Sequence, residues 1–212
     1  MDLACQTKWD KASRTYDLLT WADRRRFAAA KRQLFSAMSG RCLMVAAGTG
    51  TDFEHFPPAL AITAIDISPG MVARAARRAP AYHGSLHVEL GDVQDLVYAD
   101  ETFDTVATSC TFCSVPDPVR GLRELYRCLK PGGRLLMFEH QRSRIGPLGI
   151  LQDLMTPLTT RFGPAMNRDT VGNVLRAGFR LVRETNVYLD MVKAIEARRA
   201  DESPATPHAP SD

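Results

Sequence analysis

The stretch Val45-Ala46-Ala47-Gly48-Thr49-Gly50-Thr51 follows a short apolar run at residues 42–45. An apolar run that stops at glycines predicts a strand ending in a tight turn, because glycine lets the backbone turn and approach a ligand without a Cβ in the way. A glycine turn at the carboxyl end of a parallel strand is where open α/β sheets bind nucleotide-like molecules. Taken alone, the stretch is equally consistent with a purely structural turn.

The residues after this turn alternate between strand-like and helix-like stretches. Apolar runs rich in β-formers predict strands at residues 61–65, 86–90, 103–108 and 134–138. Amphipathic patterns predict helices that begin at Ser68-Pro69, span 116–129 and run from Asp169 to Ala177. This alternation implies a parallel sheet, and residues 179–187 and 188–197 predict a final strand pair.

The remaining segments define the domain organisation. Residues 8–38 predict two helices, so residues 1–40 are expected to form an N-terminal helical cap on one α/β domain at 41–197. In residues 141–166, glycines and prolines separate apolar pieces, which predicts a lid or substrate segment. The last residues, 198–212, are rich in proline, serine and alanine and predict a disordered tail.

Length and charge restrict the class of protein. The chain has 212 residues, of which 45% are hydrophobic, enough for one substantial core. A net charge of +3 is too small to favour a nucleic-acid partner. No apolar window is long enough to span a bilayer, so we expect a cytoplasmic protein. The basic residues at 24–26, 31 and 32 predict either a solvated helix face or contact with an anionic membrane surface. The sequence indicates no oligomeric state.

The cysteines are expected to be reduced and buried. Four of the five lie in apolar runs, namely Cys42, Cys110, Cys113 and Cys128. Cys110 and Cys113 have the spacing of metal ligands, but no second pair and no nearby histidine cluster completes a zinc site. No metal is therefore predicted.

Two acidic residues follow the predicted strands in order. Asp66 comes after the second strand and Asp92 after the third, at the same sheet edge as the glycine turn. A ribose needs an acceptor carboxylate, and an adenine amino group needs an acceptor opposite it, so together these residues predict an adenosine site. Dinucleotide sites carry a third glycine where this chain has Phe53, which disfavours a nicotinamide oxidoreductase.

These motifs resemble those of class I S-adenosylmethionine-dependent methyltransferases. The resemblance covers about residues 16–197 and rests on Ala47-Gly48-Thr49-Gly50, Asp66-Ile67-Ser68-Pro69-Gly70-Met71, Gly91-Asp92-Val93, Phe103-Asp104-Thr105-Val106 and Leu129-Lys130-Pro131-Gly132-Gly133. It implies a Rossmann-like α/β fold, with a seven-stranded, mostly parallel sheet that ends in an antiparallel hairpin. The implied cofactor is S-adenosylmethionine, and the implied cofactor-binding residues are Tyr16, Ala47, Gly48, Thr49, Gly50, Asp66, Ile67, Met71, Asp92, Val93 and Thr108.

Within this family the chain is most similar to a small branch. The branch includes ubiquinone/menaquinone C-methyltransferases, bacterial phosphatidylethanolamine N-methyltransferases and methyltransferase-like thiol methyltransferases. Tyr16-Asp17 resembles the Tyr-Asp pair beside the cofactor, and the stretches 111–115, 138–140 and 167–170 look most like the thiol-methylating group. We therefore expect methyl transfer to a small-molecule or lipid acceptor, either a thiol or an amine such as a phospholipid headgroup. The expected substrate-binding residues are Tyr16, Trp21, Ser109, Cys110, His140, Asn167 and Arg168.

Two positions leave alternatives open. His140 is the best candidate for a catalytic base, or else a histidine that is hydrogen-bonded in a loop. Met44 stands where family members usually carry Glu or Asp, and methionine cannot accept the same hydrogen bonds. It indicates weaker cofactor binding, a tolerated core substitution, or a protein of this fold that binds S-adenosylmethionine without methylating, as a regulator or a repurposed catalyst.

Overall fold

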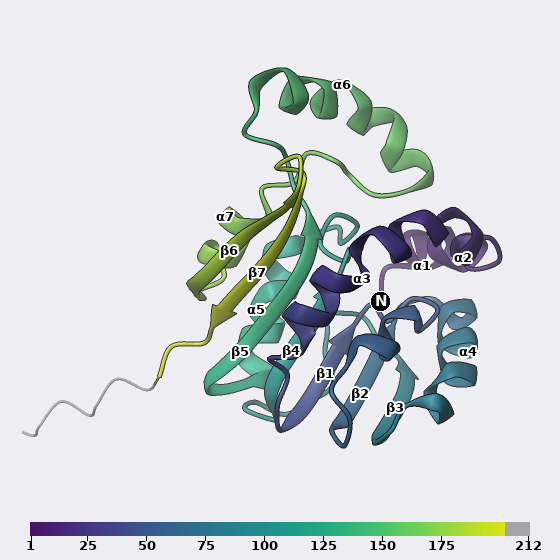
Figure 1. Cartoon of the computed structure of the whole chain (residues 1–212), viewed down its shortest axis with the longest axis vertical. Helices are drawn as coiled ribbons and strands as arrows, with labels where there is room; N and C mark the ends of the chain where they lie inside the picture. The colour runs from purple at the N-terminus through teal and green to yellow at the C-terminus, as the bar shows by residue number, and fades with distance from the viewer. Residues whose placement is uncertain (202–212) are drawn as a thin grey trace, which may run out of the picture.

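Seven strands form one sheet, in the order β3-β2-β1-β4-β5-β7-β6 (Figure 1). The structure is a computed structural model that describes residues 1–201; for Phe162 it describes the backbone alone. Neighbouring strands are parallel from β3 to β5, whereas β7 runs antiparallel to both β5 and β6. The predicted sheet and its C-terminal hairpin are confirmed. The strands are β1 (Arg41–Val45), β2 (Ala61–Asp66), β3 (Ser85–Leu90), β4 (Phe103–Ser109), β5 (Leu129–His140), β6 (Arg180–Tyr188) and β7 (Val192–Arg198).

Helices cover both faces of this sheet. Side chains of α3 (Trp21–Phe35) and α4 (Pro69–Arg78) share one buried apolar cluster with the strands, and those of α5 (Pro118–Cys128) and α7 (Thr170–Arg176) share another. Buried side chains of β1 alternate between the two faces of the sheet: Leu43 and Val45 join the α5 cluster, and Cys42 and Met44 join the α3 cluster. The remaining elements are α1 (Leu3–Ala12), α2 (Tyr16–Leu19), α6 (Gly146–Phe162) and the 3₁₀ helices η1 (Thr51–His55) and η2 (Ala79–Ala81).

Four of the seven α-helices within residues 1–201 begin after a side-chain cap. The side chain of Ser68 accepts from the backbone N–H of Met71 at the start of α4, and proline occupies the first helical position. Asp117 and Asp169 cap α5 and α7 in the same way. These caps fix the helices that connect the parallel strands.

The N-terminal region differs from its prediction. Three helices stand where two were expected over residues 8–38, because Asp2 accepts from the backbone N–H of Cys5 and starts α1 at Leu3. In Figure 1, α1 and α2 lie beside α4, next to the carboxyl ends of the first strands. The N-terminal helices therefore border the sheet edge at which the glycine turn and the two acids were expected.

The segment 141–166 also differs from its prediction. The sequence suggested separate apolar pieces, whereas α6 is one helix of 17 residues that contains Pro157. It stands beyond the carboxyl ends of the strands (Figure 1). No helix within residues 1–201 is long and apolar enough to cross a membrane.

The chain is ordered beyond the expected start of the tail at residue 198. Arg198 ends β7, and the backbone N–H of Arg199 donates to the carbonyl of Gly133. The guanidinium of Arg199 also pairs with Glu101 at 2.7 Å. Residues 202–212, the rest of the expected tail, lie outside the described residues.

Candidate active site

A cavity opens at the carboxyl edge of the sheet. It is bounded by the ends of β1, β2, β3 and β4, and by side chains of α1 and α2. Its lining residues are Cys5, Trp9, Tyr16, Val45, Ala46, Gly48, Ile65, Asp66, Ile67, Met71, Gly91, Asp92, Val93, Gln94, Ser109, Cys110, Thr111, Ser114, Val115 and Pro116.

Asp66 ends β2 in this cavity and bonds to the glycine turn. Its Oδ2 accepts from the backbone N–H of Gly48 at 2.8 Å, and its Oδ1 accepts from that of Ser68 at 2.9 Å. Burial raises the pKa of the Asp66 carboxyl, against the effect of these hydrogen bonds. Each carboxylate oxygen keeps a lone pair with which it can accept from a ligand hydroxyl.

Asp92 follows β3 and is only 6% exposed. Its Oδ1 accepts from the backbone N–H of Gln94 at 2.9 Å, and its Oδ2 accepts from the backbone N–H of Asp2 at 3.1 Å. Apolar side chains of Ile67, Met71 and Val93 line the same cavity. A flat ligand with a polar edge fits between these side chains and the Asp92 carboxylate.

The glycine turn presents only part of itself to the cavity. Ala46 and Gly48 line it, both with left-handed backbone at φ 53° and 56°. Gly50, at φ 81°, faces the protein interior, where a Cβ would lie 2.7 Å from the ring of Phe53. Gly48 is thus the expected glycine that meets a ligand, whereas Gly50 serves the packing of η1.

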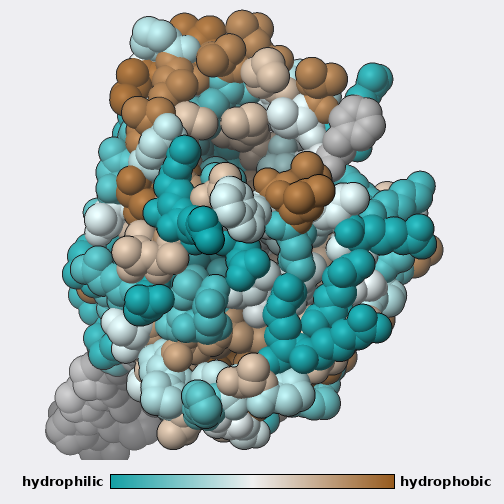
Figure 2. Space-filling view, turned by 45° about the vertical axis from the view of Figure 1, so that its right-hand side comes forward, coloured by the Kyte–Doolittle hydropathy of each residue, from teal (hydrophilic) through white to brown (hydrophobic). Residues whose placement is uncertain are grey.

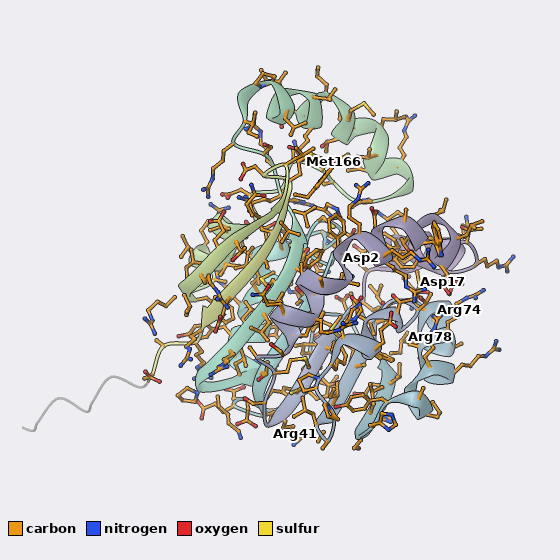
Figure 3. All side chains as sticks on the ribbon, viewed as in Figure 1. Asp2, Asp17, Arg41, Arg74, Arg78 and Met166 are labelled. Carbon is orange, nitrogen blue, oxygen red and sulfur yellow. The ribbon has the colours of Figure 1, made fainter. Side chains whose placement is uncertain are left out.

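Asp17 ties α2 to the glycine turn and to α4 (Figure 3). Its carboxylate accepts from the hydroxyl of Thr49 and pairs with Arg78 at 2.8 Å, and Arg78 also donates to the carbonyl of Thr49. Burial alone would raise the pKa of Asp17, but the bonds from Thr49 and Arg78 lower it. The adjacent Tyr16 is therefore held against Gly48: a Cβ added to Gly48 would lie 3.7 Å from the tyrosine ring.

Helix α1 closes the cavity from the side of α4. The carboxylate of Asp10 accepts from the backbone N–H of Gly70 at 2.7 Å and from the hydroxyl of Ser68 at 3.1 Å. The amide of Gln6 donates to the carbonyl of Ile67 at 3.0 Å. Cys5 and Trp9, on the same helix, line the cavity. Sequence reasoning missed this role, although Asp2 carried the helix-start signal.

A second cavity adjoins the first and shares six lining residues with it. The shared residues are Trp9, Tyr16, Ala46, Gly48, Ser109 and Cys110. The rest of its wall is Thr20, Asp23, Arg24, Phe27, Lys31, Ala47, Thr51, Asp52, Cys113, Phe138, His140 and Pro164. Two ligands bound in the two cavities would meet beside Tyr16.

His140 ends β5 at the border between two cavities. It lines the second cavity and also an apolar one beneath α6, which is formed with Gln152, Leu158 and residues 163–166. Its Nδ1 is buried and has no hydrogen-bond partner within residues 1–201. Burial lowers the pKa of His140, so the imidazole is neutral at pH 7 and can accept a proton. The alternative of a hydrogen-bonded loop histidine does not fit this environment.

Glu139 is a buried carboxylate that sequence reasoning missed. It accepts from the Thr108 hydroxyl at 2.8 Å and from the backbone N–H groups of Thr111 and Phe112 at 3.0 and 3.1 Å. Burial raises the pKa of Glu139 to about 7. It holds the loop after β4, which supplies walls to both cavities. Burial also raises the pKa of the Cys110 thiol to about 12, which leaves it a poor nucleophile.

Several expected site residues lie elsewhere. Trp21 is 54% exposed and stacks on Arg25, outside the two adjoining cavities, because α3 turns that face to the surface. Asn167 donates to Asp153, and Arg168 donates to the carbonyl of Val115, so both support the connection after α6. Thr108 is fully buried against Glu139.

Comparison with known proteins places the fold and cavities in a family. The methyltransferase domain family matches residues 43–137. Phosphatidylethanolamine N-methyltransferase of Cereibacter sphaeroides is 30% identical over 158 residues, which is 74% of this chain and 76% of that protein. The chain belongs to the class I S-adenosylmethionine-dependent methyltransferases.

Other relatives of this methyltransferase differ in their named substrates. The C-methyltransferase UbiE of ubiquinone/menaquinone biosynthesis from Geotalea daltonii is 36% identical over 57% of this chain, and the match spans only 53% of that protein. Thiol S-methyltransferase TMT1B of Rattus norvegicus is 27% identical, over 81% of this chain and 78% of its own.

Solved structures share the fold. A methyltransferase of Thermotoga maritima, described as a possible histamine N-methyltransferase, superposes with a TM-score of 0.70 at 20% identity, over 92% of this chain and 99% of its own. The [4+2]-cyclase SpnF superposes with a TM-score of 0.65 at 21% identity, over 85% and 81% of the two chains. Likeness at this level establishes the architecture alone.

The residues present fit S-adenosylmethionine, the family's cofactor. Two buried carboxylates face the first cavity. Asp66 is bonded to backbone N–H groups, and an oxygen of Asp92 also lies 3.8 Å from the N-terminal ammonium of Met1. Gly48 and Tyr16 line the same cavity. Within residues 1–201, no cluster of three or more His, Cys, Asp or Glu side chains could hold a metal ion.

Proposed function

We propose that this protein transfers the methyl group of S-adenosylmethionine to the polar head of an amphiphilic acceptor, either a thiol or an amine. One observation carries the proposal: the cavity that fits the cofactor shares a wall with a second cavity, and His140 connects that second cavity to an apolar one beneath α6. A polar head can therefore lie near Tyr16 while an apolar tail continues beneath α6.

The nucleoside-binding roles are assigned to groups in the first cavity. Asp66 would accept from the ribose hydroxyls and Asp92 from the adenine amino group, and Ile67, Met71 and Val93 would pack on the adenine ring. Gly48 and Tyr16 would border the methionine part. S-adenosylmethionine, when bound, supplies an electrophilic methyl group.

The chain itself has to align the acceptor, exclude water and remove a proton. Tyr16, Ser109 and Cys110 line both cavities and would position the acceptor at their junction. A neutral thiol or an ammonium must lose a proton, and the neutral imidazole of His140 can accept it. No covalent intermediate on the enzyme is needed, in agreement with the protonated state of Cys110.

The shape of the acceptor site favours an amphiphile. The cavity beneath α6 is lined mainly by apolar atoms, with Leu158, Pro164, Ala165 and Met166 among its residues. Relatives named for phosphatidylethanolamine and thiol methylation accord with a polar head of either kind. A quinone-like ring, as in the substrate of the UbiE relative, is the second candidate for the same cavity.

The test is transfer of labelled methyl from S-adenosylmethionine to matched acceptors. Alkanethiols, alkylamines and phosphatidylethanolamine of increasing chain length should show KM falling with chain length, because the tail fills the apolar cavity. If only short hydrophilic acceptors become labelled, the proposal of an amphiphilic acceptor is wrong. Cofactor binding without label transfer to any acceptor favours the alternative, a non-methylating protein of this fold such as the cyclase neighbour.

A His140→Gln variant tests the base. Because the pKa of His140 is lowered below its usual 6.5, the wild-type rate should hold as the pH falls and decline only below about pH 6.5. The variant should lose about 10²- to 10⁴-fold in kcat together with this acidic limb, while the KM for the cofactor stays unchanged. An acidic limb that persists in the variant would assign the titration to another group.

The same amphiphile proposal extends to contact with a membrane surface. The outer face of α6 exposes Ile150, Leu151 and Leu154, by 58, 54 and 73%. Figure 2 shows hydrophobic residues gathered at that end of the molecule. Exposed Arg161 lies in the last turn of α6, and its positive charge matches anionic headgroups. Arg142 and Arg144, just before the helix, are also exposed but pair with Asp153 and Glu184.

Flotation with liposomes measures this contact. Binding should fall on Leu154→Asp, and should fall with rising salt if the arginines contribute. The matched control is Val97→Asp, which changes an isolated exposed residue on the other side of the sheet edge. Equal loss in both variants would argue against a surface on α6.

A further inference from the structure

Lys31 on α3 and Asp52 at the start of η1 form an ion pair inside the second cavity. The Nζ of Lys31 lies 2.8 and 2.9 Å from the two carboxylate oxygens of Asp52. Their side chains are only 11% and 10% exposed. The same two elements carry a second pair, Arg24 and Glu54, at 3.4 Å, but the side chain of Glu54 is 59% exposed. Of these two pairs, only Lys31–Asp52 has both side chains largely enclosed.

Burying two charges costs desolvation energy that their mutual attraction does not reliably repay. A hydrophobic pair would join α3 to η1 at least as well. The retention of both charges against a cavity, with Phe138 stacked 5.3 Å from the ammonium, therefore indicates a ligand that uses them.

The glycine turn places this pair beside the expected cofactor. Asp52 lies two residues after Gly50, and it lines the second cavity together with Ala46, Ala47 and Gly48. Met44, in contrast, is 1% exposed and packs among apolar side chains of α3 and β5, including Phe27, Phe35 and Phe138. Met44 thus has a core role, and an acidic group is present on the other side of the turn.

We propose that Lys31 and Asp52 bind the amino-acid end of the cofactor. That end is a zwitterion, so the Asp52 carboxylate can accept from its ammonium group while the Lys31 ammonium donates to its carboxylate. Asp52 then replaces the acid that family members carry at the position of Met44. The inference rests on S-adenosylmethionine being the cofactor, as in the proposed function.

Calorimetric binding of two ligands isolates this contact. S-adenosylhomocysteine carries the amino-acid end, whereas 5′-methylthioadenosine has the same nucleoside and lacks it. The double variant Lys31→Met/Asp52→Asn removes both charges together and avoids stranding one of them. It should bind S-adenosylhomocysteine about 10- to 100-fold more weakly, as expected for lost hydrogen bonds to charged groups, with the affinity for 5′-methylthioadenosine unchanged.

Two further variants sharpen the result. Asp52→Asn alone should also weaken the binding of S-adenosylhomocysteine and leave the affinity for 5′-methylthioadenosine unchanged. The unchanged affinity for 5′-methylthioadenosine would show that the site is still folded. Glu54→Gln is the matched control, because it breaks the exposed pair between the same two elements and should leave both affinities unchanged.

Two outcomes overturn the inference alone. They are an unchanged affinity of the double variant for S-adenosylhomocysteine, and an equal loss for both ligands while the variant keeps the wild-type melting temperature. Wild-type protein that binds neither ligand overturns the proposed function and this inference with it. If the wild-type protein binds both ligands with the same affinity, the adenosine site is supported, but the protein does not bind the amino-acid end and the inference is wrong.

Discussion

Glu139 shows how one buried side chain can set the shape of two cavities. Glutamine has a single acceptor oxygen, so in a Glu139→Gln variant the N–H of Phe112 would face an amide N–H instead of Oε2. A buried donor without an acceptor costs about 1–3 kcal/mol, and we expect the free energy of unfolding in urea to fall by that amount. The control Glu54→Gln, at the surface, should change it by less than about 0.5 kcal/mol.

The same carboxyl should give stability a dependence on pH. Its pKa in the folded protein, about 7, lies above the unfolded value near 4.5, so the native state holds the proton more tightly. Its contribution to stability is present below pH 4.5 and is lost as the pH rises through about 7. Unfolding curves should show this decline in the wild-type protein and a flatter profile in Glu139→Gln. Equal slopes in the two proteins would mean that the pKa of Glu139 is the same in the folded and unfolded states.

The two acids of the first cavity could be predicted from the sequence, whereas the directions of two side chains on α3 could not. Asp66 and Asp92 each follow an apolar strand, and the carboxyl ends of parallel strands meet at one edge, so their position needs no further information. The direction of Trp21 depends on the rotation of α3 about its axis, which only packing decides. Lys31 belonged to the expected basic face, yet it turns inward to Asp52 for the same reason.

Among the elements, α1 contacts the first cavity and the start of α4, and no sequence motif predicted this. Its mixture of polar and apolar residues gives no clear stripe, because the helix lies over a cavity and the edge of α4 instead of over the core. The continuity of α6 was also unexpected. Pro147 lies in the first turn, where proline is tolerated, but Pro157 lies inside the helix, where proline removes a backbone hydrogen bond. The sequence pattern therefore predicted a break that the structure does not show.

An Asp10→Ala variant tests whether α1 acts as a cover. The change removes the acceptor for the N–H of Gly70 and the hydroxyl of Ser68, the two bonds that fix α1 to the start of α4. Amide hydrogen exchange in residues 3–12 should become faster, and S-adenosylhomocysteine should bind about 5- to 30-fold more weakly, which corresponds to about 1–2 kcal/mol.

The comparison for this variant is Thr7→Ala, which loses only a bond within α1, to the carbonyl of Leu3. It should leave exchange and affinity near those of the wild-type protein. Faster exchange in Asp10→Ala with unchanged affinity would show that α1 opens without affecting the cofactor, and the role of a cover would then be withdrawn.

At the scale of the whole molecule, the architecture follows from the alternation of strands and helices. Right-handed crossovers leave few ways to order parallel strands, and the family motifs select one of them. What the sequence leaves open is how the N-terminal helices and α6 sit on the sheet edge. Their contacts are hydrogen bonds between residues far apart in sequence, such as Gln6 and Ile67, which local sequence patterns do not predict.

The stability of the whole chain should respond to the cofactor and not to a dinucleotide. Ligand at 100 times its Kd adds about 2.7 kcal/mol to the folded state, which corresponds to a rise in Tm of about 5–11 °C for a domain of this size. S-adenosylhomocysteine should produce this rise and NADH should produce none, because Phe53 occupies the place of the third glycine of dinucleotide sites. In Asp66→Ala the rise should nearly vanish, since ribose hydroxyls would lose their acceptor in a buried site. An undiminished rise in Asp66→Ala would move the ribose away from the end of β2 and leave the first cavity to another part of the ligand.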